Sequence, residues 1–200
     1  MTLHRALVHR STAVLLTVVS LAATLAAKSP SIDVSQVRID NFGKISDSYY
    51  RGAQPLEGDY ADLAALGVRT VIDLTGDGRR DESGFVERAG MKFYRIPLTT
   101  TDRPSESAVA TFLQLVNDPV NQPVYVHCQG GRHRTGAMTA VYRMTSDGWT
   151  ADRAYAEMKQ FNFEGFPGHP ALNQFVYDYY VQIGRTRIAE QPPASTVAVR

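Results

Sequence analysis

The chain contains 200 residues, of which 44% are hydrophobic and 20% charged, which excludes wholesale disorder and fits one ordinary domain with some excess. Its 21 basic and 20 acidic residues nearly cancel, so no strong field marks a nucleic-acid binder and we expect no nucleic-acid partner. The single cysteine, Cys128, excludes an internal disulfide and a multi-thiolate zinc site. Cys128 is therefore either a buried apolar filler or a working thiol.

Residues 1–27 have the layout of a secretory signal peptide. Arg5 and Arg10 give a basic start, residues 11–27 carry no charge, and residues 28–30 (Lys-Ser-Pro) end the apolar run. The run is short and diluted for a membrane span, so we expect cleavage and export to a periplasm or out of the cell. The alternative is an uncleaved N-terminal anchor. After processing we expect no membrane partner.

The remaining chain divides into three parts. Residues 28–37 are expected to form a linker, residues 38–185 one folded domain, and residues 186–200 a disordered tail. The tail assignment follows because this end of the chain contains prolines and lacks helical periodicity.

Strand and helix patterning alternate along the domain. Gly67 and Gly90 stand where helices would end, Thr150 where one would begin, and Pro97 is expected to close a strand. The expected strands are 42–46, 49–53 (a hairpin with 42–46), 68–74, 92–96 and 124–127. The expected helices are 57–66, 81–89, 105–116, a helix from 135, 151–160 and 171–183. This order favours an α/β fold with a central, mostly parallel sheet flanked by helices on both sides.

Residues 124–136 (VYVHCQGGRHRTG) form the segment with the clearest chemical pattern. An apolar strand leads into a tight loop that contains glycines and then into a helix. Such a loop turns successive backbone N–H groups toward one point, and the positive N-terminal end of the helix faces the same point. The sequence therefore predicts an anion-binding cradle with Cys128 at one lip and Arg134 at the other.

The residue types in this loop suit attack on a phosphate ester. A thiol facing convergent N–H donors at a helix N-terminus has a lowered pKa, so Cys128 can supply a thiolate nucleophile. Arg134 offers a planar fork for two phosphoryl oxygens, and Thr135 can donate its hydroxyl to the sulfur. Gly130 and Gly131 permit a backbone shape that side chains would obstruct.

The loop HCQGGRHRTG resembles the signature of the protein tyrosine phosphatase superfamily. It is most similar to the dual-specificity branch, in particular the small plant, fungal and bacterial group with a C-x-x-G-[KR]-H-R-T-G loop. The segments YRGAQP (50–55), LGVRTVIDL (66–74) and IPL (96–98) resemble parts of the same group.

The resemblance implies the cysteine-phosphatase fold for residues 38–185, a cysteinyl-phosphate intermediate on Cys128, and no metal or cofactor. The implied substrate is a phosphorylated protein (phosphotyrosine, with phosphoserine or phosphothreonine also possible) or a small anionic phosphate ester. The loop residues implied to bind it are Gln129, Gly130, Gly131, Arg132, His133 and Arg134.

A thiolate cannot protonate a poor leaving group, so a general acid is also needed. In the family this acid is an aspartate on a loop before the helix that precedes the nucleophile strand, and Asp102 fits that place. Asp118 is a rival, although its position just after the helix suits a turn better. His127 is expected to pack and hydrogen-bond behind the loop rather than to react.

Three alternatives remain open at this point. The enzyme could act on inositol pyrophosphates or other small polyanions, for which Arg103, Arg132 and His133 are the candidate contacts; Arg132 and His133 could equally face solvent. The chain could be a non-catalytic phosphate-binding module. Sulfur transfer on a rhodanese-like loop is a weaker alternative, because the Arg-Thr-Gly continuation favours phosphate.

Overall fold

The computed structural model describes residues 32–190, with side chains placed through residue 187. The predicted signal peptide at 1–27 and residues 191–200 of the predicted tail lie outside the described residues. Among the described residues, no helix combines the length and apolarity needed to cross a bilayer.

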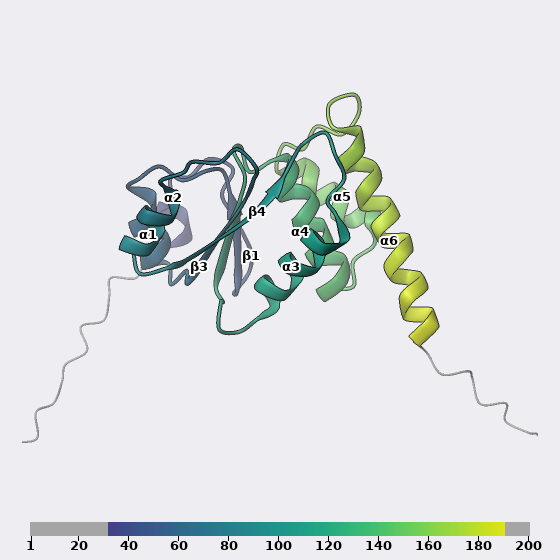
Figure 1. Ribbon diagram of the computed structural model, residues 1–200, viewed down its shortest axis with the longest axis horizontal. Coiled ribbons are helices and arrows are strands. Elements are labelled where there is room, and N and C mark those ends of the chain that lie inside the picture. The colour runs from purple at the N-terminus through teal and green to yellow at the C-terminus, as the bar shows by residue number, and fades with distance from the viewer. Residues whose placement is uncertain (1–31, 191–200) are drawn as a thin grey trace, which may run out of the picture.

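Five strands form one mixed sheet at the centre of the molecule (Figure 1). Four of them run parallel, and only the hairpin between the first two is antiparallel. In spatial order the strands are β1 (Gly43–Ser46), β2 (Tyr49–Gly52), β5 (Val124–His127), β3 (Thr70–Thr75) and β4 (Lys92–Leu98). The predicted mostly parallel sheet and the predicted hairpin are thus confirmed.

Helices cover both faces of this sheet. One face packs against α1 and α2, and the other against α3 to α6, as Figure 1 shows. In chain order the helical segments are the 3-10 turn η1 (Val34–Gln36), α1 (Asp59–Ala65), α2 (Glu82–Arg88), α3 (Glu106–Asn117), α4 (His133–Ser146), α5 (Ala151–Gln160) and α6 (Pro170–Glu190). The predicted α/β fold is confirmed.

The side chains of β5 alternate between the two cores. Val124 and Val126 lie in the core under α3 to α6, whereas Tyr125 lies in the core under α1 and α2. His127 stacks on Tyr125, with ring centroids 5.7 Å apart, and Cys128 belongs to the opposite core. His127 and Cys128 thus point to opposite faces of the sheet, as consecutive residues of an extended strand do.

All four parallel strands end at one edge of the sheet. Gly52 and Asp73 both lie opposite His127, and Thr75 lies opposite Leu98. The loops that follow β2, β3, β4 and β5 therefore gather at the carboxyl ends of the strands, which is where open α/β sheets bind ligands.

Several predicted boundaries differ from the observed ones, and three of the differences affect the site or the end of the domain. β4 continues through Pro97 to Leu98, because it is an edge strand, where a missing N–H is tolerated. α4 begins at His133 rather than at residue 135, so Arg134 lies in its first turn. α6 extends to Glu190, so residues 186–190 continue this helix instead of belonging to a disordered tail. Within the predicted linker, residues 34–36 form η1, and Val34 and Val37 pack on the core under α1 and α2.

Candidate active site

Cys128 lies at the end of β5 with only 2% of its surface exposed. Burial acts to raise the pKa of this thiol, but several donors outweigh it. The hydroxyl and N–H of Thr135, the charge of Arg134 and the N–H of Gly131 all favour the thiolate, so the pKa of Cys128 is held below its ordinary value. This arrangement supports the working-thiol interpretation of the sequence.

Arg134 occupies the first turn of α4 and is nearly buried. Its Nη1 donates to the Leu98 carbonyl at 3.4 Å and lies 3.6 Å from Oδ1 of Asp77. Its Nε is buried and has no hydrogen-bond partner among the described residues. The guanidinium therefore keeps donor capacity for a phosphoryl oxygen at the mouth of the loop.

Gly131 is the tightest point of the loop. Its φ is +63°, and a Cβ at this position would overlap the backbone carbon and oxygen of Gly52. Gly130 is less constrained, because a Cβ there would meet only the Arg132 side chain at 3.7 Å. The predicted need for glycine thus applies to Gly131 in particular.

Asp102 lies exposed on the loop after β4. Its Oδ2 accepts hydrogen bonds from the hydroxyls of Thr99 at 2.7 Å and Thr101 at 3.2 Å. Within residues 32–187, no hydrogen bond or ion pair joins Asp102 to the loop 128–134. Asp118, the other candidate for the general acid, accepts a hydrogen bond from the Val120 N–H at 2.9 Å, as expected of a turn residue.

Asp77 is a second carboxylate near the site that sequence reasoning did not single out. It is 90% exposed on the loop after β3, and its Oδ1 lies 3.6 Å from Nη1 of Arg134. A phosphoryl group bound to Arg134 would carry the same charge as Asp77, so the two would compete for this guanidinium.

The basic residues considered for polyanion binding differ in their surroundings. The His133 ring lies against that of His169, with centroids 3.7 Å apart and planes tilted by 47°, and burial together with His169 lowers the pKa of His133 to about 4. Arg103 pairs with Asp178 on α6 at 2.6 Å. Arg132 remains exposed. Of the three, only Arg132 is an exposed cation without an ion pair among the described residues.

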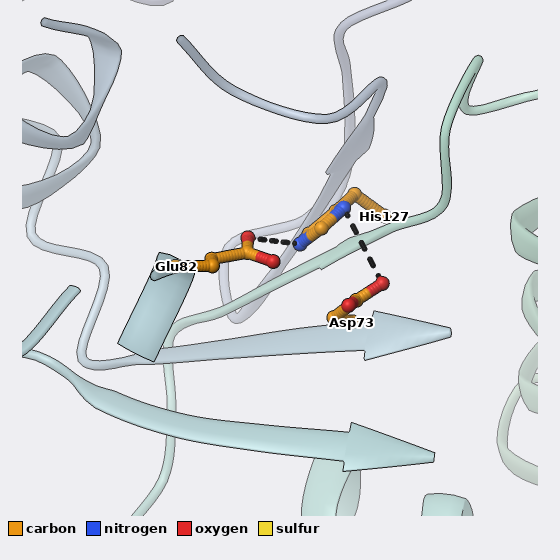
Figure 2. Close-up of side chains that lie close together, drawn as sticks. All are labelled: Asp73, Glu82 and His127. Atoms are coloured by element: carbon orange, nitrogen blue, oxygen red, sulfur yellow. Dashed lines mark ion pairs between the residues drawn. The ribbon is translucent and has the colours of Figure 1, made fainter. Parts of the chain in front are cut away.

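A buried acidic pair lies behind the loop, on the α2 side of the sheet (Figure 2). Nε2 of His127 lies 2.8 Å from Oε1 of Glu82, and Nδ1 lies 3.9 Å from Oδ1 of Asp73. Arg95 balances both acids, with Nε 2.7 Å from Asp73 and Nη2 3.4 Å from Glu82.

These three side chains could offer ligands to a metal ion, but the carboxylates of Asp73 and Glu82 already have partners, whereas neither ring nitrogen of His127 makes a well-directed hydrogen bond among the described residues. Besides Arg95, Asp73 accepts from the N–H and hydroxyl of Thr75, and Glu82 accepts from the Tyr60 hydroxyl at 2.9 Å. Asp73 and Glu82 thus have their negative charge compensated within the fold, and the cluster surrounds the His127 ring on the face of the sheet opposite Cys128. The expected supporting role of His127 agrees with this geometry.

Glu82→Gln is expected to destabilise the fold by about 2–4 kcal/mol near pH 7, because it removes a buried carboxylate that pairs with Arg95 and faces His127. Burial acts to raise the Glu82 pKa, but His127 and the Tyr60 hydroxyl outweigh it and hold that pKa below its ordinary value. The stabilisation is therefore present above the unfolded-state pKa of about 4.3 and is lost as the pH falls through the lower folded-state pKa. Urea unfolding of both proteins over this range measures the difference; a difference that stays constant as the pH falls below about 4 would contradict the assignment.

Residues 27–171 match the family described as "DSP-PTPase phosphatase fused to NAD+ Kinase". Among curated proteins, the chain is 30% identical over 143 residues to the dual specificity protein phosphatase TpbA of Pseudomonas aeruginosa, covering 71% of this chain and 64% of TpbA. It is 25% identical over 158 residues to the inositol diphosphatase SIW14 of Saccharomyces cerevisiae, covering 76% of this chain and 55% of SIW14. The chain therefore spans less than two thirds of the length of either relative.

Solved structures show the same fold. The crystal structure of P. aeruginosa TpbA superposes with a TM-score of 0.64 at 26% identity, covering 80% of this chain and 94% of that one. The catalytic core of S. cerevisiae SIW14, solved with citrate, gives a TM-score of 0.62 at 24% identity, covering 76% of this chain and 92% of that one. The predicted resemblance is confirmed: the chain belongs to the DSP-PTPase family, in the dual-specificity branch of the protein tyrosine phosphatase superfamily.

Proposed function

We propose that this protein hydrolyses phosphate monoesters through a cysteinyl-phosphate intermediate, with phosphotyrosine-bearing proteins as its leading substrate class. The observation that carries the proposal is a buried thiol of lowered pKa that shares one loop with Arg134, a guanidinium with a free buried donor. The nucleophile and the phosphoryl-binding group thus sit on the same rigid turn between β5 and α4. A structure of TpbA in complex with phosphotyrosine, at 25% identity and a TM-score of 0.64, supports the substrate class.

The proposed reaction has two steps, transfer of the phosphoryl group to Cys128 and its hydrolysis. Sγ of Cys128 attacks phosphorus, so the S–P bond forms while the P–O bond to the leaving group breaks, and Asp102 gives the leaving oxygen its proton. Water then attacks phosphorus, the S–P bond breaks, and the carboxylate of Asp102 takes the proton from the water. Arg134 and the loop N–H groups hold the phosphoryl oxygens in both steps, and Thr135 stabilises the sulfur as leaving group.

Asp102→Asn is expected to lower kcat for an aryl phosphate by about 10²-fold, less than loss of the nucleophile, since the amide cannot donate the proton. The matched control is Asp118→Asn, an exposed aspartate beyond the other end of α3, which should leave kcat unchanged. Steady-state kinetics with leaving groups of different pKa measures the effect. An Asp102→Asn loss that is equal for good and poor leaving groups would contradict a role in protonation.

A second substrate class is inositol pyrophosphates or other small polyanions. SIW14 is an inositol diphosphatase, and Arg132 stands exposed at the loop without an ion pair among the described residues. Arg103 and His133 give this class less support, because Arg103 is paired with Asp178 and His133 stays neutral near pH 7. Specificity constants for phosphopeptides and inositol phosphates, measured with wild type and Cys128→Ser together, test both substrate classes. A specificity constant for phosphopeptides equal to or higher than that for inositol phosphates would contradict the polyanion class.

Export through cleavage of residues 1–27 is part of the same proposal, supported by the basic and then uncharged sequence of this segment. The intact mass of the protein recovered from its own cells tests it. A mass that includes residues 1–27 would favour the uncleaved anchor.

A further inference from the structure

The outer side of the loop 128–134 is held by one neighbouring stretch of chain, residues 41–54 around the β1–β2 hairpin. Three successive backbone carbonyls of the loop accept hydrogen bonds from it. The pairs are Gln129 O with the Gln54 N–H at 3.1 Å, Gly130 O with Asn41 Nδ2 at 3.4 Å, Gly131 O with the same Asn41 Nδ2 at 3.0 Å, and Gly131 O with Arg51 Nη2 at 2.6 Å.

These contacts fix the direction of the inward-facing N–H groups. In a trans peptide the carbonyl of one residue and the N–H of the next point in opposite directions. A Gly130 carbonyl held outward therefore turns the Gly131 N–H inward, and a Gly131 carbonyl held outward does the same for the Arg132 N–H. The Gly131 N–H is one of the donors that favour the Cys128 thiolate.

Arg51 is wholly buried, which is an expensive position for a guanidinium. Its Nη2 bond to the loop is its only hydrogen bond among the described residues, and its Nε and Nη1 have no partner there. Its Cζ lies 4.0 Å from the ring centroid of Phe161, which holds the guanidinium plane in place. Arg51 is thus a buried cation whose one hydrogen bond among the described residues goes to the Gly131 carbonyl. We infer that its role is to hold that carbonyl.

Asn41 is held as firmly. Its φ is +56°, a left-handed conformation that asparagine tolerates better than most residues. Its Nδ2 also donates to the Phe161 carbonyl at 2.9 Å, and its Oδ1 accepts from Asn162 Nδ2 at 3.3 Å. The carbonyls of Gly130, Gly131 and Phe161, which all accept from Nδ2, orient the amide with its donor toward the loop, and the exposed 3.3 Å bond from Asn162 is not needed for this.

We propose that Asn41 and Arg51 are positioning residues of the active site: from outside the loop they hold the Gly130 and Gly131 carbonyls away from the cradle, so that the Gly131 and Arg132 N–H groups face the bound anion. Neither residue touches the substrate. The proposal deepens the proposed function but depends only on the loop binding a tetrahedral oxyanion beside a thiolate.

The test compares Asn41→Gly with Asn162→Gly. Glycine accepts the positive φ at both positions, and each change removes one amide without adding charge. Asn162 is exposed and its side chain reaches Asn41 but not the loop, which makes it the matched control. Because the chain has one cysteine, the rate of alkylation by iodoacetamide against pH reports Cys128 alone, and orthovanadate protection against alkylation reports oxyanion binding.

Asn41→Gly should raise the midpoint pH of the alkylation-rate curve by about one unit and raise the orthovanadate concentration needed for half-protection about tenfold. Asn162→Gly should change neither quantity. Arg51→Lys, which keeps the charge but loses the fork, should shift both readouts in the same direction and serves as the second variant if Asn41→Gly does not fold. A folded Asn41→Gly with wild-type values, or the same shift in Asn162→Gly, would overturn the proposal. Neither readout needs turnover, so absence of phosphatase activity would count against the proposed function alone.

Discussion

Cys128→Ser is expected to reduce turnover of an aryl phosphate by at least about 10³-fold, because a serine hydroxyl is not ionised near neutral pH and is a far weaker nucleophile. The donors that lower the thiol pKa cannot compensate, since they stabilise an anion that serine does not form. The oxyanion cradle itself should survive, because Arg134 and the backbone donors are unchanged.

Steady-state hydrolysis of p-nitrophenyl phosphate measures the loss, and orthovanadate or phosphopeptide binding by the serine variant serves as the control for folding. Retained hydrolysis by Cys128→Ser would contradict the assignment of the nucleophile. Loss of wild-type activity on adding a chelator would contradict the metal-independent mechanism.

Gly131→Ala is expected to lower kcat/KM by about 10²-fold or more, whereas Gly130→Ala should have a much smaller effect. At position 131 the new methyl would overlap the backbone of Gly52, and alanine is strained at a φ of +63°. Since neither backbone can give way like a flexible side chain, the loop must shift, and a displacement near 1 Å costs roughly 10²-fold in rate.

Gly130→Ala is the matched control, because its nearest contact is the flexible Arg132 side chain at 3.7 Å. Steady-state kinetics and thermal unfolding of both variants separate the loss of loop geometry from a loss of folding. Equal effects at the two positions would contradict the close approach between the loop and Gly52.

The sequence was sufficient for the parts of the site that depend on short-range pattern. The strand before Cys128, the glycine loop and the helix with Arg134 lie within one run of residues, and the structure places them as expected. The predicted helix N-cap at Thr150 is also local, and its hydroxyl accepts from the Arg153 N–H.

The parts that the sequence did not predict depend on long-range contacts. Asn41 and Arg51 reach Gly131 across 90 and 80 positions, and no periodicity in the chain indicates those pairs. The sequence indicated no role for Arg51 beyond its place in the YRGAQP segment. Asp77 comes to Arg134 because β3 and β5 are neighbours in the sheet, which the order of elements does not specify.

The proposed general acid, Asp102, was only partly predictable from the sequence. The sequence places Asp102 on the loop after β4, and the structure puts that loop at the same sheet edge, where the carbonyl of Leu98, the last residue of β4, accepts from Arg134. The carboxylate itself is held by Thr99 and Thr101 rather than over Cys128. In the proposed mechanism, protonation of the leaving group by Asp102 therefore requires this loop to change its conformation when substrate binds.

The central claim, a phosphoryl group carried on Cys128, is tested most directly by mass analysis of the enzyme quenched during turnover of an aryl phosphate. Since the chain has a single cysteine, one added phosphoryl group on the peptide that contains residue 128 identifies the site without ambiguity. We predict this adduct in the wild type, at a higher level when quenched earlier, and none in Cys128→Ser. Hydrolysis by the wild type with no phosphorylated Cys128 peptide at any quench time would contradict the account.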